Sequence, residues 1–210
     1  MKKNKIRKKY YQYVMEHMAP PTKLKTFLDF ADLQKEDFYE KYNSLRQVEL
    51  DIWKKSLKDV LSHLANTEDF LAYNQRNKGL AFMFSWFEFM NSNQDFFRNC
   101  KTLRSPHFIY GSNDFKKVLK AFIKKIIKTG VASQEFKERG LDPKYMCEMF
   151  MGLFFMNLRK WQTCSKKKSK KQDDFMDALT EKSMIFFFDS LAPNLFDTFI
   201  DLMKHQRSRK

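Results

Sequence analysis

A helix-turn-helix pattern near the N-terminus constrains the fold of this 210-residue chain more than any other feature. Residues 22–30 have the apolar spacing of a short helix, and a tight turn follows directly. A second short helix is closed by Phe38, Tyr39 and Tyr42, and a long helix begins near Leu45. In this layout the second helix enters the major groove of DNA. The pattern therefore predicts that the N-terminal part of the chain binds nucleic acid.

The same segment resembles the DNA-binding domain of TetR-type (tetracycline-repressor-like) transcriptional regulators. The positions that match the family's pattern are Thr22, Phe27, Leu28, Ala31, Leu33, Phe38, Tyr39 and Tyr42. The departures are Asp32 for the turn Gly, Gln34 for a Ser cap, Lys41 for His and Leu45 for Lys. Asp tolerates left-handed backbone better than most residues, so Asp32 is compatible with the turn.

The composition favours an all-α fold. Only five Gly and five Pro occur in 210 residues, which leaves little punctuation for a many-stranded fold. We expect a three-helix helix-turn-helix domain over residues 1–64, which includes the start of a connecting fourth helix. The resemblance implies a helical bundle for effector binding and dimerisation over residues 65–210. Within the expected nine helices, Thr22 should cap the second, the fifth should run unbroken from Thr67 to about Asn91, and Gly130 should end the seventh.

The resemblance implies a set of DNA contacts. The candidate residues are Thr22, Lys23, Lys35, Tyr39 and Lys41, with the Tyr39 hydroxyl on a phosphate. Tyr39 has the alternative role of a packing residue, and Thr22 that of a plain helix cap. Three acids, Glu36, Asp37 and Glu40, share the short third helix and would be repelled by phosphate.

The charge is strongly positive but unevenly placed. The formal net charge is +15, which attracts polyanions such as nucleic acid or acidic lipid. Residues 1–9 hold six Lys or Arg and no acid, whereas residues 10–64 hold eight basic and nine acidic residues. The expected DNA-binding domain therefore owes its positive charge to its N-terminal arm. The lysine run over residues 166–171 is interpreted as a surface loop.

The wealth of aromatic residues, with 23 Phe, predicts either an apolar ligand cavity or a bulky filled core. The candidate lining residues are Phe84, Trp86, Phe87, Glu88, Tyr145, Phe150 and Phe154. Glu88 or Tyr145 would supply the polar group at the head of a lipid-like effector. A two-fold interface is expected from the apolar stripes of the last two helix systems, namely Phe150, Phe154, Phe188, Leu191, Leu195, Phe199 and Leu202.

Several classes of protein are disfavoured. Cys100, Cys147 and Cys164 are odd in number and far apart, which supports neither a disulfide framework nor a metal site and suits a reducing cytoplasm. No catalytic motif is visible, so neither an enzyme nor a cofactor is expected. The longest nearly apolar run, over residues 79–90, is too short to cross a bilayer.

By resemblance, the chain is expected to be a homodimeric transcriptional regulator. It would bind near-palindromic double-stranded DNA, and an apolar small molecule or lipid would shift the spacing of its recognition helices. Two alternatives remain open. One is a lipid-binding accessory protein like that of coenzyme Q biosynthesis, which the TetR fold also resembles and which acts through partner enzymes. The other is a helical dimer that acts through protein contacts alone.

Overall fold

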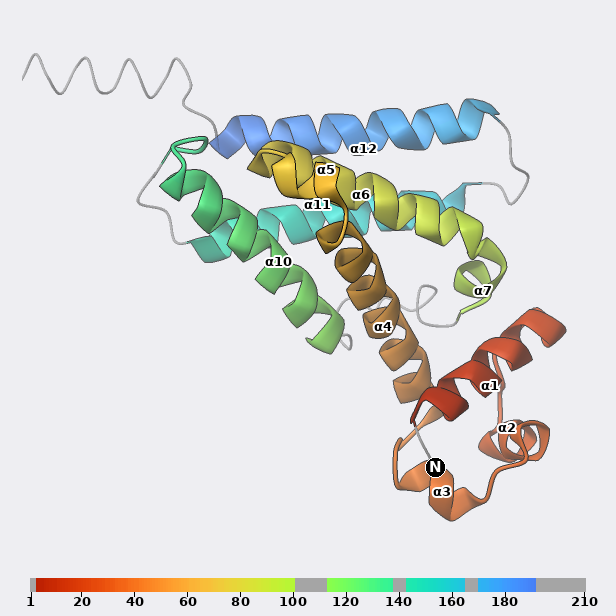
Figure 1. The fold of residues 1–210 in the computed structure, drawn as a ribbon. Helices are drawn as coiled ribbons and strands as arrows, with labels where there is room; N and C mark the ends of the chain where they lie inside the picture. Colours follow the sequence, from red (N-terminus) through yellow and green to blue (C-terminus); the bar gives the residue numbers. More distant parts are fainter. Residues whose placement is uncertain (1–2, 101–112, 138–142, 165–169, 192–210) are drawn as a thin grey trace, which may run out of the picture.

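The computed structural model describes residues 3–100, 113–137, 143–164 and 170–191 of the chain, and every regular element within these ranges is an α-helix (Figure 1). The helices are α1 (Lys3–His17), α2 (Leu24–Ala31), α3 (Lys35–Tyr39), α4 (Leu45–Ala65), α5 (Glu68–Ala72), α6 (Gln75–Ser92), α7 (Gln94–Asn99), α10 (Asn113–Ala132), α11 (Pro143–Thr163) and α12 (Lys170–Leu191). The prediction of an all-α protein is confirmed.

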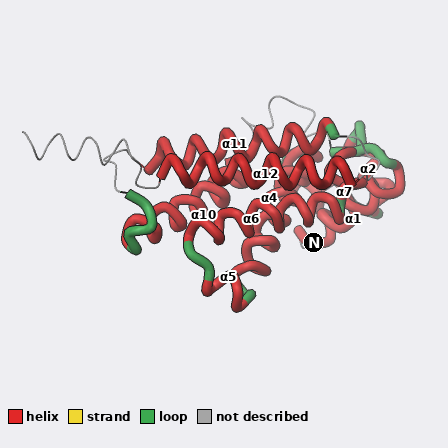
Figure 2. The backbone as a smooth tube through the Cα atoms, turned by 90° about the horizontal axis from the view of Figure 1, so that it is seen from above, coloured by secondary structure: helices red, strands yellow, loops and turns green. Residues whose placement is uncertain are grey.

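The helices form a small N-terminal group joined by α4 to a larger bundle. Figure 1 shows α1, α2 and α3 together at one end of the molecule, from which α4 rises into a bundle of α6, α10, α11 and α12. α4 packs against α1 and also against α6 and α10. Seen from above, α11 and α12 lie side by side along one edge, with α5 at the opposite edge (Figure 2). Because α4 packs on both groups, the division at residue 64 stays a proposal.

The predicted fifth helix is broken into α5 and α6, so that expectation was wrong. Tyr73 leaves the helical region with a ψ of 144°. Asn74 then starts a new helix, and its side chain accepts a hydrogen bond from the backbone N–H of Asn77 at 2.8 Å. A short polar side chain satisfies one of the N–H groups that a new helix leaves exposed, which favours a restart at this point.

Two other predicted helix ends also differ. Thr22 is not the cap of α2, because the capping position is Lys23, in extended backbone and without a side-chain capping bond. Gly130 does not end its helix but lies within α10. A Cβ atom at Gly130 would lie 2.1 Å from the ring of Phe136, so glycine allows this ring to pack on the helix.

The centre of the larger bundle is a continuous cluster of aromatic rings. Trp53 of α4 packs edge-on against Phe97 of α7, with ring centroids 4.6 Å apart. Trp86 of α6 lies 5.8 Å from Phe115 of α10 and 6.0 Å from Phe154 of α11, again between ring centroids. Aromatic pairs at these separations add to the stability gained by burial. The cluster therefore fixes α4, α6, α7, α10 and α11 relative to one another.

Candidate nucleic-acid interface

The turn between α2 and α3 has the left-handed backbone that the sequence pattern requires. Asp32 adopts φ 50° and ψ 61°. The backbone N–H of Leu33 donates to the carbonyl of Leu28 at 3.0 Å and closes the end of α2. The expectation that Asp can replace glycine here is confirmed, since Asp pays a smaller steric cost in this region than most residues.

A small aromatic core holds α3 in place. Phe38 is fully buried, and its ring centroid lies 6.2 Å from those of both Phe27 and Tyr42. The Tyr42 hydroxyl donates to Asp51 Oδ2 at 2.7 Å, and Arg7 donates to the same oxygen at 3.2 Å. Burial and, next, the hydrogen bond to Asp51 raise the pKa of Tyr42 above its usual value. These contacts attach the end of the helix-turn-helix to both α1 and α4.

The structure brings two predicted DNA contacts, Thr22 and Tyr39, to one hollow. Both side chains are exposed, and they line an open hollow of about 510 Å³. The other predicted contacts lie nearby in sequence. Lys23 is exposed just before α2, and Lys35 Nζ lies 5.9 Å from the ring centroid of Tyr39. Lys41 is half-buried and forms an ion pair with Glu40.

The same hollow includes three residues that sequence reasoning missed. Asn43, Ser44 and Arg46 line it at the start of α4. The Ser44 side chain accepts from the backbone N–H of Gln47 at 3.2 Å and so caps this helix. Polar side chains at the start of a helix suit a phosphate oxygen. The Ser44 cap before a long apolar-striped helix was the available signal.

The acids of α3 have a structural reason to be there. Glu36 and Asp37 occupy the first turn of α3, where a negative charge complements the helix dipole. Glu40 is exposed, and its hydrogen bond to Lys41 lowers the pKa of its carboxyl group. This pairing takes up part of the positive charge that Lys41 would offer to DNA.

The predicted ligand-lining residues separate into two groups. Trp86, Phe87, Phe150 and Phe154 are buried, and Phe84 is half-buried. The predicted polar anchors were placed wrongly, because Glu88 is exposed and Tyr145 is 65% exposed. Neither side chain therefore lies among the buried rings.

Sequence reasoning missed two buried polar atoms that lie within the larger bundle. Trp86 Nε1 and Asn157 Oδ1 are buried and lack a hydrogen-bond partner among the described residues. The Asn157 amide nitrogen donates to Ser183 Oγ at 3.0 Å and to the Leu153 carbonyl at 2.8 Å. Such unpaired groups are unusual in a protein interior.

The expected dimer residues lie inside one chain. Phe150, Phe154, Phe188 and Leu191 are at most 4% exposed and pack within the bundle, so they present no surface to a second chain. Leu195, Phe199 and Leu202 lie outside the described residues. The outer faces of α11 and α12 instead expose other large apolar side chains, namely Met156, Phe175, Ile185 and Phe186. The prediction therefore placed the interface on a face of α11 and α12 that the chain itself buries.

The fold has clear counterparts among solved structures, although no protein-family model and no curated protein matches the sequence. The fatty acid degradation regulator FadR from Bacillus halodurans shares 13% identity at a TM-score of 0.59, over 89% of this chain and 94% of that one. FadR from Bacillus subtilis, in complex with stearoyl-CoA, shares 14% identity at a TM-score of 0.60, over 89% of this chain and 98% of that one. A tetR-family regulatory protein from Rhodococcus RHA1 shares 12% identity at a TM-score of 0.54, over 91% of this chain and 97% of that one.

This chain has the TetR-type fold. The likeness extends over 94–98% of those chains and 89–91% of this one, so it takes in both the helix-turn-helix and the larger bundle. None of the helices in the described part of the chain is long and apolar enough to cross a membrane. Among the same residues, no group of three or more His, Cys, Asp or Glu side chains is arranged to hold a metal ion.

Proposed function

We propose that the protein is a DNA-binding transcriptional regulator. The observation that carries the proposal is the exposed hollow at the helix-turn-helix, where Thr22, Tyr39 and Arg46 come together from three segments of the chain. Hydroxyl and guanidinium groups are suitable donors to phosphate oxygens and set the position of a protein on a duplex. The TetR-type fold of the whole chain supports the same function.

Binding to the DNA upstream of the protein's own gene tests this proposal. In a gel-shift titration, Tyr39→Phe should weaken binding, because it removes a hydroxyl donor from the hollow. Tyr145→Phe is the matched control, since Tyr145 is also exposed but lies on α11. Absence of a shifted species for the wild-type protein at any low salt concentration would refute DNA binding.

A salt titration tests the contribution of Lys41. If Lys41 contacts one phosphate, Lys41→Ala should make the slope of log binding constant against log salt shallower by roughly 0.9. Its ion pair with Glu40 predicts that Glu40→Gln strengthens binding, because this change frees the ammonium group. The control Lys182→Ala, on the exposed face of α12, should leave the slope unchanged.

We infer an apolar effector with a long acyl chain. The larger bundle is filled by contacting aromatic rings, among which Trp86 Nε1 and Asn157 Oδ1 lack partners. A thioester or carboxyl group could accept from the first atom, and an amide or hydroxyl group could donate to the second. The Bacillus subtilis regulator of the same fold was solved with stearoyl-CoA. Binding here requires some rings to move apart, because they pack against one another in this structure.

Titration with stearoyl-CoA tests the effector proposal. Binding should change the tryptophan fluorescence, since Trp86 lies in the proposed site, and should weaken in Asn157→Leu. Melting curves of the free variant establish that it is folded. If wild-type protein binds no acyl-CoA and native mass spectrometry detects no co-purified lipid, the effector proposal fails while DNA binding can still hold.

A second candidate is a lipid-binding accessory protein that does not bind DNA. The observation that favours it is the acidic outer surface of α3, where Glu36 and Glu40 are exposed and Lys41 is paired. Lipid binding without any DNA binding at low salt would support this second function. DNA binding that is released by the lipid would support the regulator.

A further inference from the structure

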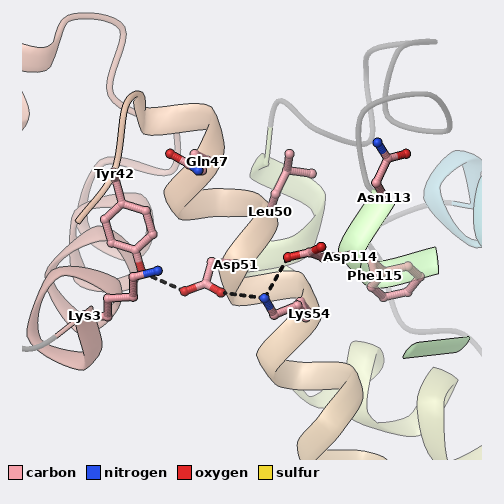
Figure 3. Close-up of a pocket in the computed structure, with 9 residues that line it drawn as sticks. All are labelled: Lys3, Tyr42, Gln47, Leu50, Asp51, Lys54, Asn113, Asp114 and Phe115. Carbon is pink, nitrogen blue, oxygen red and sulfur yellow. Dashed lines mark hydrogen bonds and ion pairs between the residues drawn. The ribbon is translucent and has the colours of Figure 1, made fainter. Parts of the chain in front are cut away.

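A chain of charged groups connects the larger bundle to the helix-turn-helix (Figure 3). Lys54 of α4 stands at its centre, with Nζ 2.9 Å from Asp114 Oδ2 of α10 and 3.6 Å from Asp51 Oδ1 of α4. The other oxygen of Asp51 accepts from Tyr42 and Arg7. One bridge of side chains therefore runs from α10 through α4 to the end of the helix-turn-helix and to α1.

The chain of contacts borders an open pocket rather than a packed seam. The pocket has a volume of about 260 Å³ and is lined by residues of α1, α4 and α10 together with the segment after α3. Lys3 reaches over the same place, with Nζ 5.2 Å from the centroid of the Tyr42 ring. On this open side of the junction, directed polar contacts add to the apolar packing of α4 on α10, where the ring centroids of Trp53 and Phe115 lie 6.2 Å apart.

The charges around Asp114 favour its ionised form. The pKa of Asp114 lies below its usual value, mainly because of the hydrogen bond and the charge of Lys54. The charges of Lys117 and Lys58 lower this pKa by smaller amounts. The hydrogen bond to Asp114 in turn raises the pKa of Lys54. Both partners are thus charged at neutral pH, and the bridge between α10 and α4 is intact.

We propose that Lys54 is a positioning residue that narrows the range of orientations of the helix-turn-helix relative to the larger bundle by bridging Asp114 and Asp51. Asp51 carries the contacts to α1 and Tyr42, so a shift of α10 is transmitted to both. A role of this bridge in regulation rests on the proposed function, whereas the bridge itself is a property of the free protein. An exposed ion pair contributes little to global stability, although it can change the ratio of two orientations by about two- to fivefold.

Pulsed electron paramagnetic resonance on the free protein tests this proposal. Spin labels at Glu36→Cys in α3 and Lys182→Cys in α12, both exposed positions, report the distance between the two parts. The background carries Cys164→Ser, because Cys100 and Cys147 are buried. Labelled protein is diluted with unlabelled protein so that only distances within one chain are seen. Asp114→Asn should broaden the distance distribution, and Asp114→Glu should restore it.

Asp59→Asn is the matched control, because it breaks the Lys55–Asp59 ion pair, which lies within α4 and bridges nothing. It should leave the distribution unchanged. Salt at about 1 M should broaden the wild-type distribution more than that of Asp114→Asn, since the variant already lacks the Lys54–Asp114 contact that the salt screens. The proposal is overturned if Asp114→Asn gives the wild-type distribution, or if the control broadens it equally. No DNA is present, so a failure to bind DNA would leave this result standing.

Discussion

At the scale of single residues, the most unusual feature is a carboxyl group buried between the two parts of the molecule. Glu49 of α4 is 1% exposed and accepts a hydrogen bond from the Tyr10 hydroxyl of α1 at 2.8 Å. Burial, followed by the charge of Glu49, raises the pKa of Tyr10 and also that of the Cys100 thiol at the end of α7. The three groups link α1, α4 and α7, and a buried charge needs such polar neighbours.

Removal of the Tyr10 hydroxyl should therefore destabilise the fold. We expect Tyr10→Phe to lower the free energy of unfolding by about 1.5–3 kcal/mol, the range for a hydrogen bond to a charged group. Urea denaturation followed by circular dichroism gives this value. Tyr73→Phe removes a hydroxyl from an exposed residue and should change it little. Equal stability of the two variants would show that the Tyr10–Glu49 bond contributes nothing.

The raised pKa values of Tyr10 and Tyr42 predict a loss of stability in alkali. In the unfolded chain both phenols ionise near pH 10, whereas in the folded state burial and neighbouring carboxylates keep them protonated. Their contribution is complete below about pH 10 and is lost as the pH rises further, because the unfolded state then releases protons that the folded state retains. The urea concentration at the midpoint of unfolding should fall as the pH rises from about 8 to 11. The fall should be shallower for Tyr10→Phe than for the wild-type protein.

At the scale of elements, close helix contacts and clamps determine the packing of the bundle. Arg98 of α7 donates to the carbonyls of Gln162 and Cys164 at 3.3 and 2.7 Å, and its guanidinium lies 4.4 Å from the Trp161 ring centroid. These bonds satisfy carbonyls at the end of α11 that the helix leaves without partners. On its other side α7 packs against α1, where Phe96 stacks on Tyr11. α7 therefore joins α11 to α1.

α6 and α12 approach closely at a glycine, which gives a second stability test. A Cβ atom at Gly79 would lie 2.4 Å from Cζ of Phe188, a ring that is itself buried and packed against Phe136. Gly79→Ala should therefore destabilise the protein by about 1–3 kcal/mol. Gly152→Ala is the control, because nothing lies near its Cβ position, and it should stabilise α11 by about 0.5–1 kcal/mol. Thermal or urea unfolding distinguishes the two, and equal gains would place α12 elsewhere.

At the scale of the whole molecule, the exposed faces of α11 and α12 are the surface we propose for a second copy of the chain. Met156, Phe175 and Leu179 line an apolar groove of about 340 Å³ between the two helices. Ile185 and Phe186 continue the exposed apolar surface along α12. An apolar face of this kind marks an association surface, and a two-fold dimer would use the same face of both chains.

A single charge on this face should prevent dimer formation. Phe186→Glu places a carboxylate on each side of an apolar contact and should give monomers in sedimentation velocity experiments. Leu71→Glu is the control, because Leu71 is exposed to nearly the same extent, 63% against 61%, but lies on α5. It should leave the oligomeric state unchanged. A wild-type-like dimer for Phe186→Glu would place the interface on another surface.

The sequence by itself determined the fold class and the local plan of the helix-turn-helix. Helical spacing, scarce glycine and the run that ends at Tyr42 predicted α2, the turn at Asp32 and α3, because these features depend on neighbours in sequence. The same local information missed the break between α5 and α6, where the Asn74 cap competes with helix continuation.

Only the tertiary structure decided which face of each helix is buried. In the sequence Phe150 and Phe188 belong to apolar stripes that suit an interface, and the structure buries both inside one chain while it exposes Phe186. Three other features also depend on contacts between segments that are separate in the sequence. They are the pairing of Lys54 with Asp114, the burial of Glu49, and the hollow that Thr22, Tyr39 and Arg46 line together. A side chain's spacing identifies its stripe on a helix, but its burial depends on which helices pack against that stripe.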